Sequence, residues 1–373
     1  MKIAKARIYF EPVRMWEWSE NMFIKELKES MLLPQEEILI NRRVYIRGIP
    51  AHIISLTKEK HRNALWVLYE GASGSSEEME DIYEIDGEER IGNKTNRQDI
   101  VDPMHRERNA RNIGFISEIT IQNQKLIFTS SQGYHLHDRH YEGYMQLQHF
   151  IEKGLDLEGL NEINVNNLVI QCYAQDENPE FPEIDLSKAL DITLKIGSDF
   201  KRELMDPPMA SIQLRFKEYE KEHKFSFFDP VENENIEFYI NKMEHYDVWE
   251  ETKKRVEKEW PKIASKDEIE QIKGELFDTI EQICPKGMDL AIMEYESEKD
   301  VQLNFYTTEY LDSKPIHRSS SVGMIFSPEN KLGQNGFTNR ICMLKPVAKD
   351  FNEAIEIELL YWFREIPEEI IHI

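Results

Sequence analysis

Alternation of apolar and polar residues predicts β-strands along most of this chain. At residues 4–10, small or apolar side chains alternate with lysine, arginine and tyrosine, which is typical of a strand with one buried face. The same alternation over residues 113–128, with a turn at Asn123–Gln124, predicts a β-hairpin. Further strands are expected at 44–54 (interrupted at 48–50), 65–69, 168–173, 192–196, 212–216, 289–295, 301–306, 341–347 and 355–363.

Apolar residues at a period near 3.6 predict several helices between these strands. The clearest lies at 267–283, where Ser265 and Glu268 form a capping box before an apolar stripe. A helix at 141–153 is expected to end at Gly154. We also predict helices at 19–34, 185–190 and 235–260. The last is predicted from the spacing of Ile236, Ile240 and Met243, with a break near His245 as the alternative to one continuous helix.

The mixture of strands and helices predicts an α+β protein with two domains. Each domain should contain a mainly antiparallel or mixed sheet and a few packed helices. Asp206-Pro207-Pro208 cannot continue a helix or a central strand, so we place the boundary there, giving domains 1–205 and 206–373. Residues 71–103 are rich in glycine, serine and acidic side chains and are expected to form an exposed insertion.

Charge limits the partners that this chain can bind. Its 70 acidic and 46 basic residues give a formal net charge of −24. A field of this sign repels phosphate, so direct nucleic-acid binding is disfavoured and a protein partner with a basic surface is expected. The three cysteines form no C-x-x-C pair, and no apolar run reaches the roughly 18 residues of a membrane span. These features indicate a cytoplasmic protein without a membrane segment.

A histidine cluster offers the densest chemistry in the sequence. His135, His137 and His140 follow a predicted strand with the spacing H-x-H-x-x-H, and three imidazoles can bind a divalent metal. The spacing superficially resembles the H-x-H-x-D-H motif of the metallo-β-lactamase fold. Arg139 stands where that family has its aspartate, so membership is rejected. The alternative, which we favour, is that these histidines pack against neighbouring tyrosines or lie on a polar loop.

A second group of residues is basic. His105, Arg106, Arg108 and Arg111 gather positive charge and are a candidate anion-contacting patch, although a solvated charged segment is the more common interpretation. No G-x-x-x-x-G-K-[ST] or G-x-G-x-x-G loop is present in the sequence, so the usual nucleotide-binding loops are not indicated. No serine or cysteine nucleophile can be assigned beside the histidines from the sequence.

Two functional hypotheses follow. The first is a non-catalytic cytosolic interaction or regulatory protein, working through its surfaces in a multi-protein bacterial assembly. The composition, rich in isoleucine, lysine, glutamate and asparagine, is similar to that of many bacterial proteins, including components of phage-defence systems. That resemblance rests on no specific residues. The second is a metal-dependent hydrolase or nuclease that uses the histidine cluster and a divalent metal as its cofactor.

Overall fold

The chain divides into two compact units built from interleaved segments. The computed structural model describes residues 5–9, 31–60, 62–71, 94–109, 111–136, 141–160, 162–175, 180–220, 223–258, 266–316 and 323–373. Unit 1 comprises Met1–Met15, Ile91–Met104 and Arg202–Arg364, and unit 2 comprises Trp16–Arg90, His105–Lys201 and Glu365–Ile373. The predicted division into the consecutive halves 1–205 and 206–373 stays a prediction.

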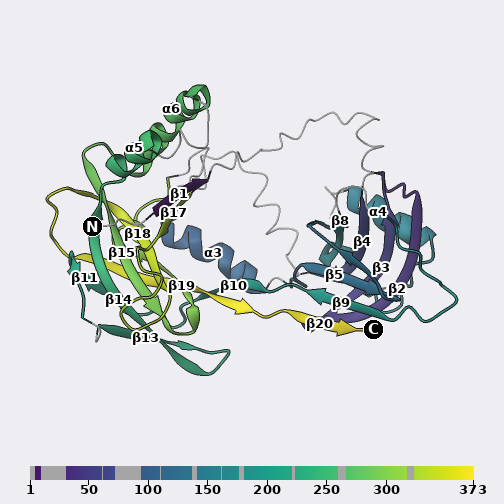
Figure 1. Ribbon diagram of the computed structural model, residues 1–373. Helices are drawn as coiled ribbons and strands as arrows, with labels where there is room; N and C mark the ends of the chain where they lie inside the picture. The colour runs from purple at the N-terminus through teal and green to yellow at the C-terminus, as the bar shows by residue number, and fades with distance from the viewer. Residues whose placement is uncertain are drawn as a thin grey trace. The chain divides into compact units, whose positions relative to one another are not determined.

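Unit 2 is built from two antiparallel sheets (Figure 1). The larger sheet has the order β2-β3-β4-β8-β7, and the smaller has the order β20-β9-β5-β6. The strands of the larger sheet are β2 (Glu36–Ile46), β3 (Ile49–Lys58), β4 (Asn63–Glu70), β7 (Ser130–His135) and β8 (Leu168–Gln175). Those of the smaller sheet are β5 (Ile116–Ile121), β6 (Gln124–Ile127), β9 (Ile192–Ile196) and β20 (Glu369–His372).

The larger sheet of unit 2 is buried on both faces. One face packs on the smaller sheet through residues such as Ile53, Val67 and Ile119. The other face packs on helix α4 (Tyr141–Glu152), where Phe150 contacts the ring of Trp66 with centroids 5.6 Å apart. A short 3-10 turn, η1 (Val165–Asn167), leads into β8. Burial on both faces explains why seven consecutive residues are buried in each of β3 and β4, the polar side chains of His52, Ser55 and Thr57 included.

Unit 1 likewise contains two sheets of its own. The first contains β12 (Lys217–Glu218), β13 (Lys224–Asp229), β14 (Glu234–Tyr246), β15 (Met288–Ser297) and β18 (Asn339–Ala348). The second contains β10 (Asp199–Leu204), β11 (Ile212–Leu214), β16 (Gln302–Thr307) and β19 (Ile355–Ile366). A separate pair joins β1 (Lys5–Tyr9) to β17 (Gly323–Ser327). Aromatic and aliphatic side chains between the two sheets, among them Phe238, Phe305 and Trp362, form the core.

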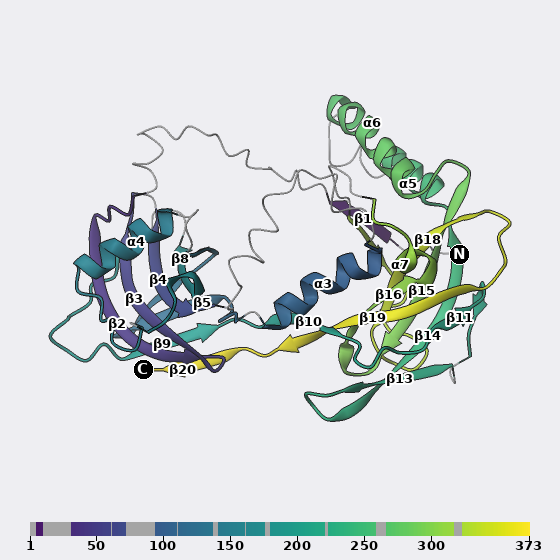
Figure 2. The same cartoon turned by 180° about the vertical axis from the view of Figure 1, so that it is seen from behind.

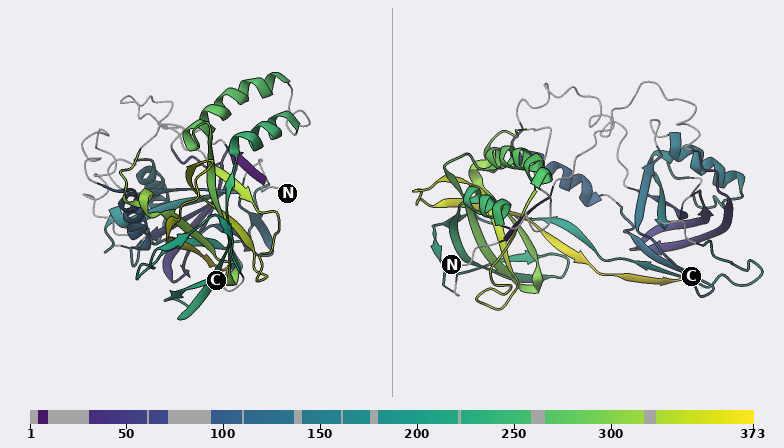
Figure 3. Two further views of the ribbon diagram at one scale, coloured as in Figure 1. Left: turned by 90° about the vertical axis from the view of Figure 1, so that its left-hand side faces the viewer. Right: turned by 45° about the horizontal axis from the view of Figure 1, so that its top comes forward.

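Helices cover the outer faces of both sheets of unit 1. Helices α5 (Val248–Lys258) and α6 (Lys266–Ile283) lie side by side in Figure 3 and pack on the first sheet, with Val256 and Ile280 buried. Helix α3 (Asn96–Asn109) runs along β10 and β19, as Figure 2 shows, and its Met104 packs near Leu360. Helix α7 (Thr308–Asp312) and the 3-10 turn η3 (Glu298–Asp300) complete the unit.

A buried carboxylate fastens one loop to the first sheet of unit 1. The Glu296 side chain, on β15, has no solvent exposure. The Asn335 backbone N–H donates to Oε1 at 2.9 Å, the Asn335 side-chain amide donates to Oε1 at 3.1 Å, and the Phe337 N–H donates to Oε2 at 3.0 Å. A side chain on Gly333 would collide with this carboxylate. The loop at 333–337 is therefore built around a single acidic group.

The structure confirms most predicted elements and corrects three of them. The hairpin at 113–128 and the helices at 141–153 and 267–283 are present. The predicted helix at 235–260 is wrong over its first half, because residues 234–246 form β14 and the helix α5 starts at Val248. Residues 185–190 form a turn rather than a helix, and residues 96–103 of the expected insertion are helical in α3. Residues 19–30 of the predicted helix at 19–34 lie outside the described residues, as do residues 72–93, and residues 31–34 are not helical.

The class of the fold is therefore mainly β with packed helices. The strand pairings of unit 2, the pair of β1 with β17, those among β12, β13, β14, β15 and β18, and those of β11 and β16 with β19 are all antiparallel, so no mixed sheet is seen among these strands. The expected α+β class agrees with this arrangement only at the coarse level of antiparallel sheets accompanied by helices.

Candidate functional site

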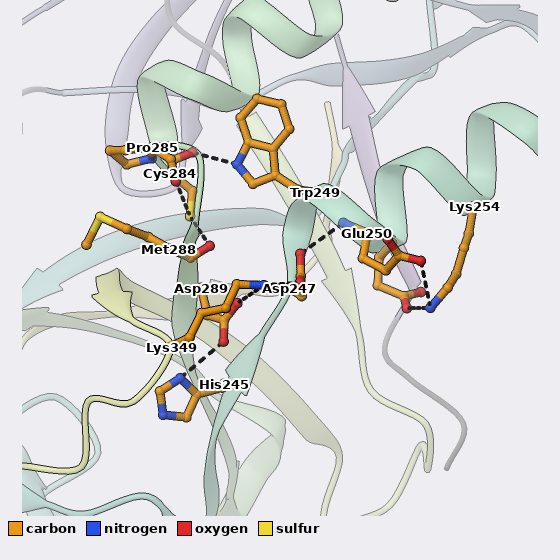
Figure 4. A network of polar contacts seen from close by, with 11 residues as sticks. His245, Asp247, Trp249, Glu250, Lys254, Cys284, Pro285, Met288, Asp289 and Lys349 are labelled. Atoms are coloured by element: carbon orange, nitrogen blue, oxygen red, sulfur yellow. Dashed lines mark hydrogen bonds and ion pairs between the residues drawn. The ribbon is translucent and has the colours of Figure 1, made fainter.

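A polar network in unit 1 joins the end of β14, the start of α5, the start of β15 and residue 349, which follows β18 (Figure 4). The Lys349 Nζ lies 2.6 Å from Asp247 Oδ2 and 3.6 Å from Asp289 Oδ1. His245 Nδ1 lies 3.4 Å from Asp289 Oδ2, and its Nε2 is 2.9 Å from the carbonyl oxygen of Phe351. His245 is therefore held by one hydrogen bond at Nε2, while its buried Nδ1 forms no hydrogen bond among the described residues.

This network is held together by its own charges. Asp247 also caps α5, since its Oδ1 accepts the backbone N–H of Glu250 at 2.9 Å. Burial tends to raise the pKa of Asp247, but hydrogen bonds from Lys349 and Glu250 lower it below its usual value. The hydrogen bond with Asp247 raises the pKa of Lys349, so this lysine stays an ammonium ion and cannot act as a base near neutral pH. We interpret the network as structural: it connects the ends of β14, α5, β15 and β18.

The three cysteines are poor candidates for nucleophilic catalysis. Burial raises the pKa of the Cys172 thiol to about 12, that of Cys284 to about 11 and that of Cys342 to about 12. The thiolate, not the thiol, is the nucleophile. All three side chains are therefore protonated at neutral pH, and none is in a disulfide.

The histidine cluster is described only in part. His135 is exposed at the end of β7, where it pairs with Val169 of β8, and a side chain on Gly71 would come within 3.2 Å of its ring. His137 and His140 lie outside the described residues, so the metal-binding hypothesis stays a prediction. In the part of the chain that the structure describes, no three His, Cys, Asp or Glu side chains are arranged to hold a metal ion.

The candidate anion-contacting patch is also only partly described. Arg111 forms an ion pair with Glu70 of β4, so its charge is matched within unit 2. His105 is exposed on α3. The side chains of Arg106 and Arg108 lie outside the description, and whether these four residues form one surface stays a prediction.

Ion pairs occupy basic side chains on both units. In unit 2, for example, Arg43 Nη2 lies 3.0 Å from Asp156, and in unit 1 Arg97 forms a bidentate pair with Glu358 at 2.7 and 2.8 Å. Described lysines and arginines in such pairs include Arg47, Lys58, Arg62, Lys125, Lys195, Lys224, Lys242, Lys254, Arg340, Lys345 and Arg364. Because acidic residues outnumber basic ones by 70 to 46, at least 24 carboxylates have no lysine or arginine to pair with.

Strand β7 is the feature that sequence reasoning missed. The sequence Ser130-Ser-Gln-Gly suggested that the preceding strand simply ends there, because it contains no apolar residue. In the structure these residues form the edge strand of the larger sheet of unit 2, paired only with β8 among the described strands. Residues 130–133 are exposed and uncharged. No sequence signal that we used distinguishes such a strand from a loop.

Comparison of the chain with protein-family models, with curated proteins and with solved structures finds no match. None of the helices among the described residues has the length and apolarity needed to cross a membrane.

Proposed function

We propose that this protein is a non-catalytic interaction protein that binds a partner protein with a basic surface. The observation that carries the proposal is the pairing of basic side chains within each unit, as in Arg111 with Glu70 and Arg97 with Glu358. Paired cations contribute little outward positive field, whereas the net charge of −24 attracts cations and repels phosphate. A basic protein is thus a better partner than a nucleic acid.

The cellular location is part of the same proposal. Three free cysteines, two of them buried, are typical of a reducing compartment, which supports the cytoplasm. We further propose that the partner is a component of a multi-protein bacterial assembly, as the composition suggests.

Affinity isolation at three salt concentrations tests this function. The tagged protein is isolated from the cells that express it at about 0.05, 0.15 and 0.5 M salt, where the Debye length falls from roughly 14 to 4 Å. We expect a stoichiometric basic protein that is retained at low salt and released at high salt. Recovery without a stoichiometric protein partner, or tight salt-sensitive binding to bare duplex DNA, would contradict the proposal and direct attention to His105, Arg106, Arg108 and Arg111.

A further inference from the structure

The backbone of β7 presents unused hydrogen-bonding groups. The N–H of Leu136 donates to the carbonyl of Leu168 at 2.9 Å, which continues the pairing of Tyr134 with Ile170. Antiparallel pairing alternates, so the even-numbered residues of β7 bond to β8 and the odd-numbered ones point the other way. On the other side of β8, the N–H of Gly71 donates to the carbonyl of Asn167 and continues the pairing of β4 with β8, which agrees with that alternation. The backbone groups of Ser131 and Gly133 therefore point to the open edge.

Two other sheet edges in unit 2 are covered by the chain itself. At β2, Asn41 accepts the N–H of Asp156 at 3.0 Å, and Arg43 pairs with Asp156. At β6, Gln124 accepts the N–H of Glu183 at 3.0 Å. Among the described residues, no comparable cover lies along Ser131 and Gly133 of β7. Proteins usually protect such an edge with charges, proline or a bulge, and residues 130–133 have none of these.

The charge beside β7 is negative. Burial raises the pKa of Tyr134, and the negative charge of Glu142, at the start of α4, raises it further. A side chain on Gly143 would come within 3.4 Å of Tyr134, so the preceding residue, Glu142, also lies close to β7. The positive charge of Arg62 lowers the pKa of Tyr134, but Arg62 is itself paired with Glu59 at 2.8 Å. A cation on an incoming segment would meet this carboxylate and the overall charge of −24.

We propose that β7 accepts an extended, basic segment of a partner protein as an added strand. The segment would form main-chain hydrogen bonds with Ser131 and Gly133, and its lysines or arginines would lie near Glu142. The short side chains at both positions leave room for close approach. This inference rests on the proposed function and assigns it a docking edge.

Variants at Ser131 separate the backbone contribution from the side chain. Ser131→Pro removes an N–H that points away from β8, so the ladder with β8 is kept, as proline is tolerated on edge strands with this orientation. Ser131→Ala is the matched control, because it removes the hydroxyl and keeps the N–H. Ser131→Lys is a second variant that keeps the N–H but repels a basic segment. Circular dichroism and thermal unfolding establish that each variant is folded.

The probe is a fluorescent nine-residue peptide that alternates lysine and valine, with a glutamate–valine peptide for comparison. We expect saturable binding of the lysine peptide to the full chain, at least about tenfold tighter than that of the glutamate peptide. Ser131→Pro and Ser131→Lys should each weaken it at least about fivefold, and Ser131→Ala should not. Binding should also slow amide hydrogen exchange at Ser131 and Gly133.

Three results would overturn the docking edge. The first is that both Ser131→Pro and Ser131→Lys bind the lysine peptide with wild-type affinity. The second is that the lysine peptide shows no saturable binding. The third is slow amide exchange at Ser131 and Gly133 in the free protein, because this would mean that the chain covers its own edge. The partner isolated by salt-dependent affinity distinguishes this failure from failure of the function. If that partner binds Ser131→Pro as it binds the wild type, the interaction function stands and the assignment to β7 is wrong.

Discussion

Replacing Glu296 by glutamine tests whether one buried carboxylate holds the loop at 333–337. The substitution keeps the size of the side chain but exchanges one acceptor oxygen for an NH₂ donor. The remaining carbonyl can still accept from Asn335, as Oε1 does now. The NH₂ group would then face the N–H of Phe337, which at present donates to Oε2 at 3.0 Å.

The expected cost follows from this arrangement. A hydrogen bond to a charged acceptor contributes about 1.5–3 kcal/mol, and a buried donor left without an acceptor costs a further 1–3 kcal/mol. Removing the negative charge from a buried site returns part of this free energy, because burying a carboxylate is itself unfavourable. We therefore expect Glu296→Gln to lower the local free energy of opening by about 2–3 kcal/mol. Glu296→Ala should cost more, because it leaves the donors of Asn335 unpaired as well.

Amide hydrogen exchange is the appropriate assay, because it reports local opening even though the chain has two units. For peptides covering β15 and residues 331–341, a loss of 2–3 kcal/mol should speed exchange about 30- to 150-fold. Glu309→Gln is the matched control. The Glu309 side chain forms an ion pair with Lys345 but is 76% exposed, so this substitution should change the exchange rates little. If Glu296→Gln exchanged at the wild-type rate, the hydrogen bonds would do no more than offset the cost of the buried charge.

Three further outcomes are expected. Burial and, to a lesser extent, the charge of Arg43 lower the pKa of His52 below 6.5, so as the pH falls the unfolded chain takes up a proton at this residue before the folded chain does. The free energy of unfolding should therefore decrease from pH 7 to 5, and His52→Gln should make it depend less on pH, as urea titrations would show. Cys172 and Cys284 should resist iodoacetamide in the native protein at pH 7.5 and react after denaturation, as mass spectrometry would show; rapid native labelling would contradict their raised pKa. Protein purified without a histidine tag should contain no stoichiometric metal, and stoichiometric zinc or manganese lost on His137→Ala would instead support the hydrolase hypothesis.

Local pattern was sufficient where a segment has one regular periodicity. The stripe of α6 and the alternation of β9 each have a single period along their whole length, so both were predicted. Strand β14 was misread because a bulge between Ile240 and Lys242 breaks its alternation. Ile236, Ile240 and Met243 are all buried in the strand, yet across the bulge their spacing imitates one face of a helix.

The candidate sites were less predictable than the fold. Sequence reasoning weights residues that can do chemistry, and it therefore selected histidines and arginines. The charge of Arg111 is matched by Glu70, which lies 41 positions earlier, and such a pair cannot be read from spacing. The docking edge at β7 depends on which strand ends a sheet, and that follows from the pairing of segments far apart in the chain.

The interleaving of segments has a consequence for how the chain is made. Strand β20 pairs with β9 to complete the smaller sheet of unit 2, with Ile371 opposite Leu194. The ribosome must therefore deliver residues 369–372 before that sheet is whole, long after most of unit 2 has emerged. Until then β9 has an unpaired edge for the whole time in which residues 202–364 are synthesised. A nascent chain of this protein is thus expected to need protection from aggregation at β9, which the finished molecule does not.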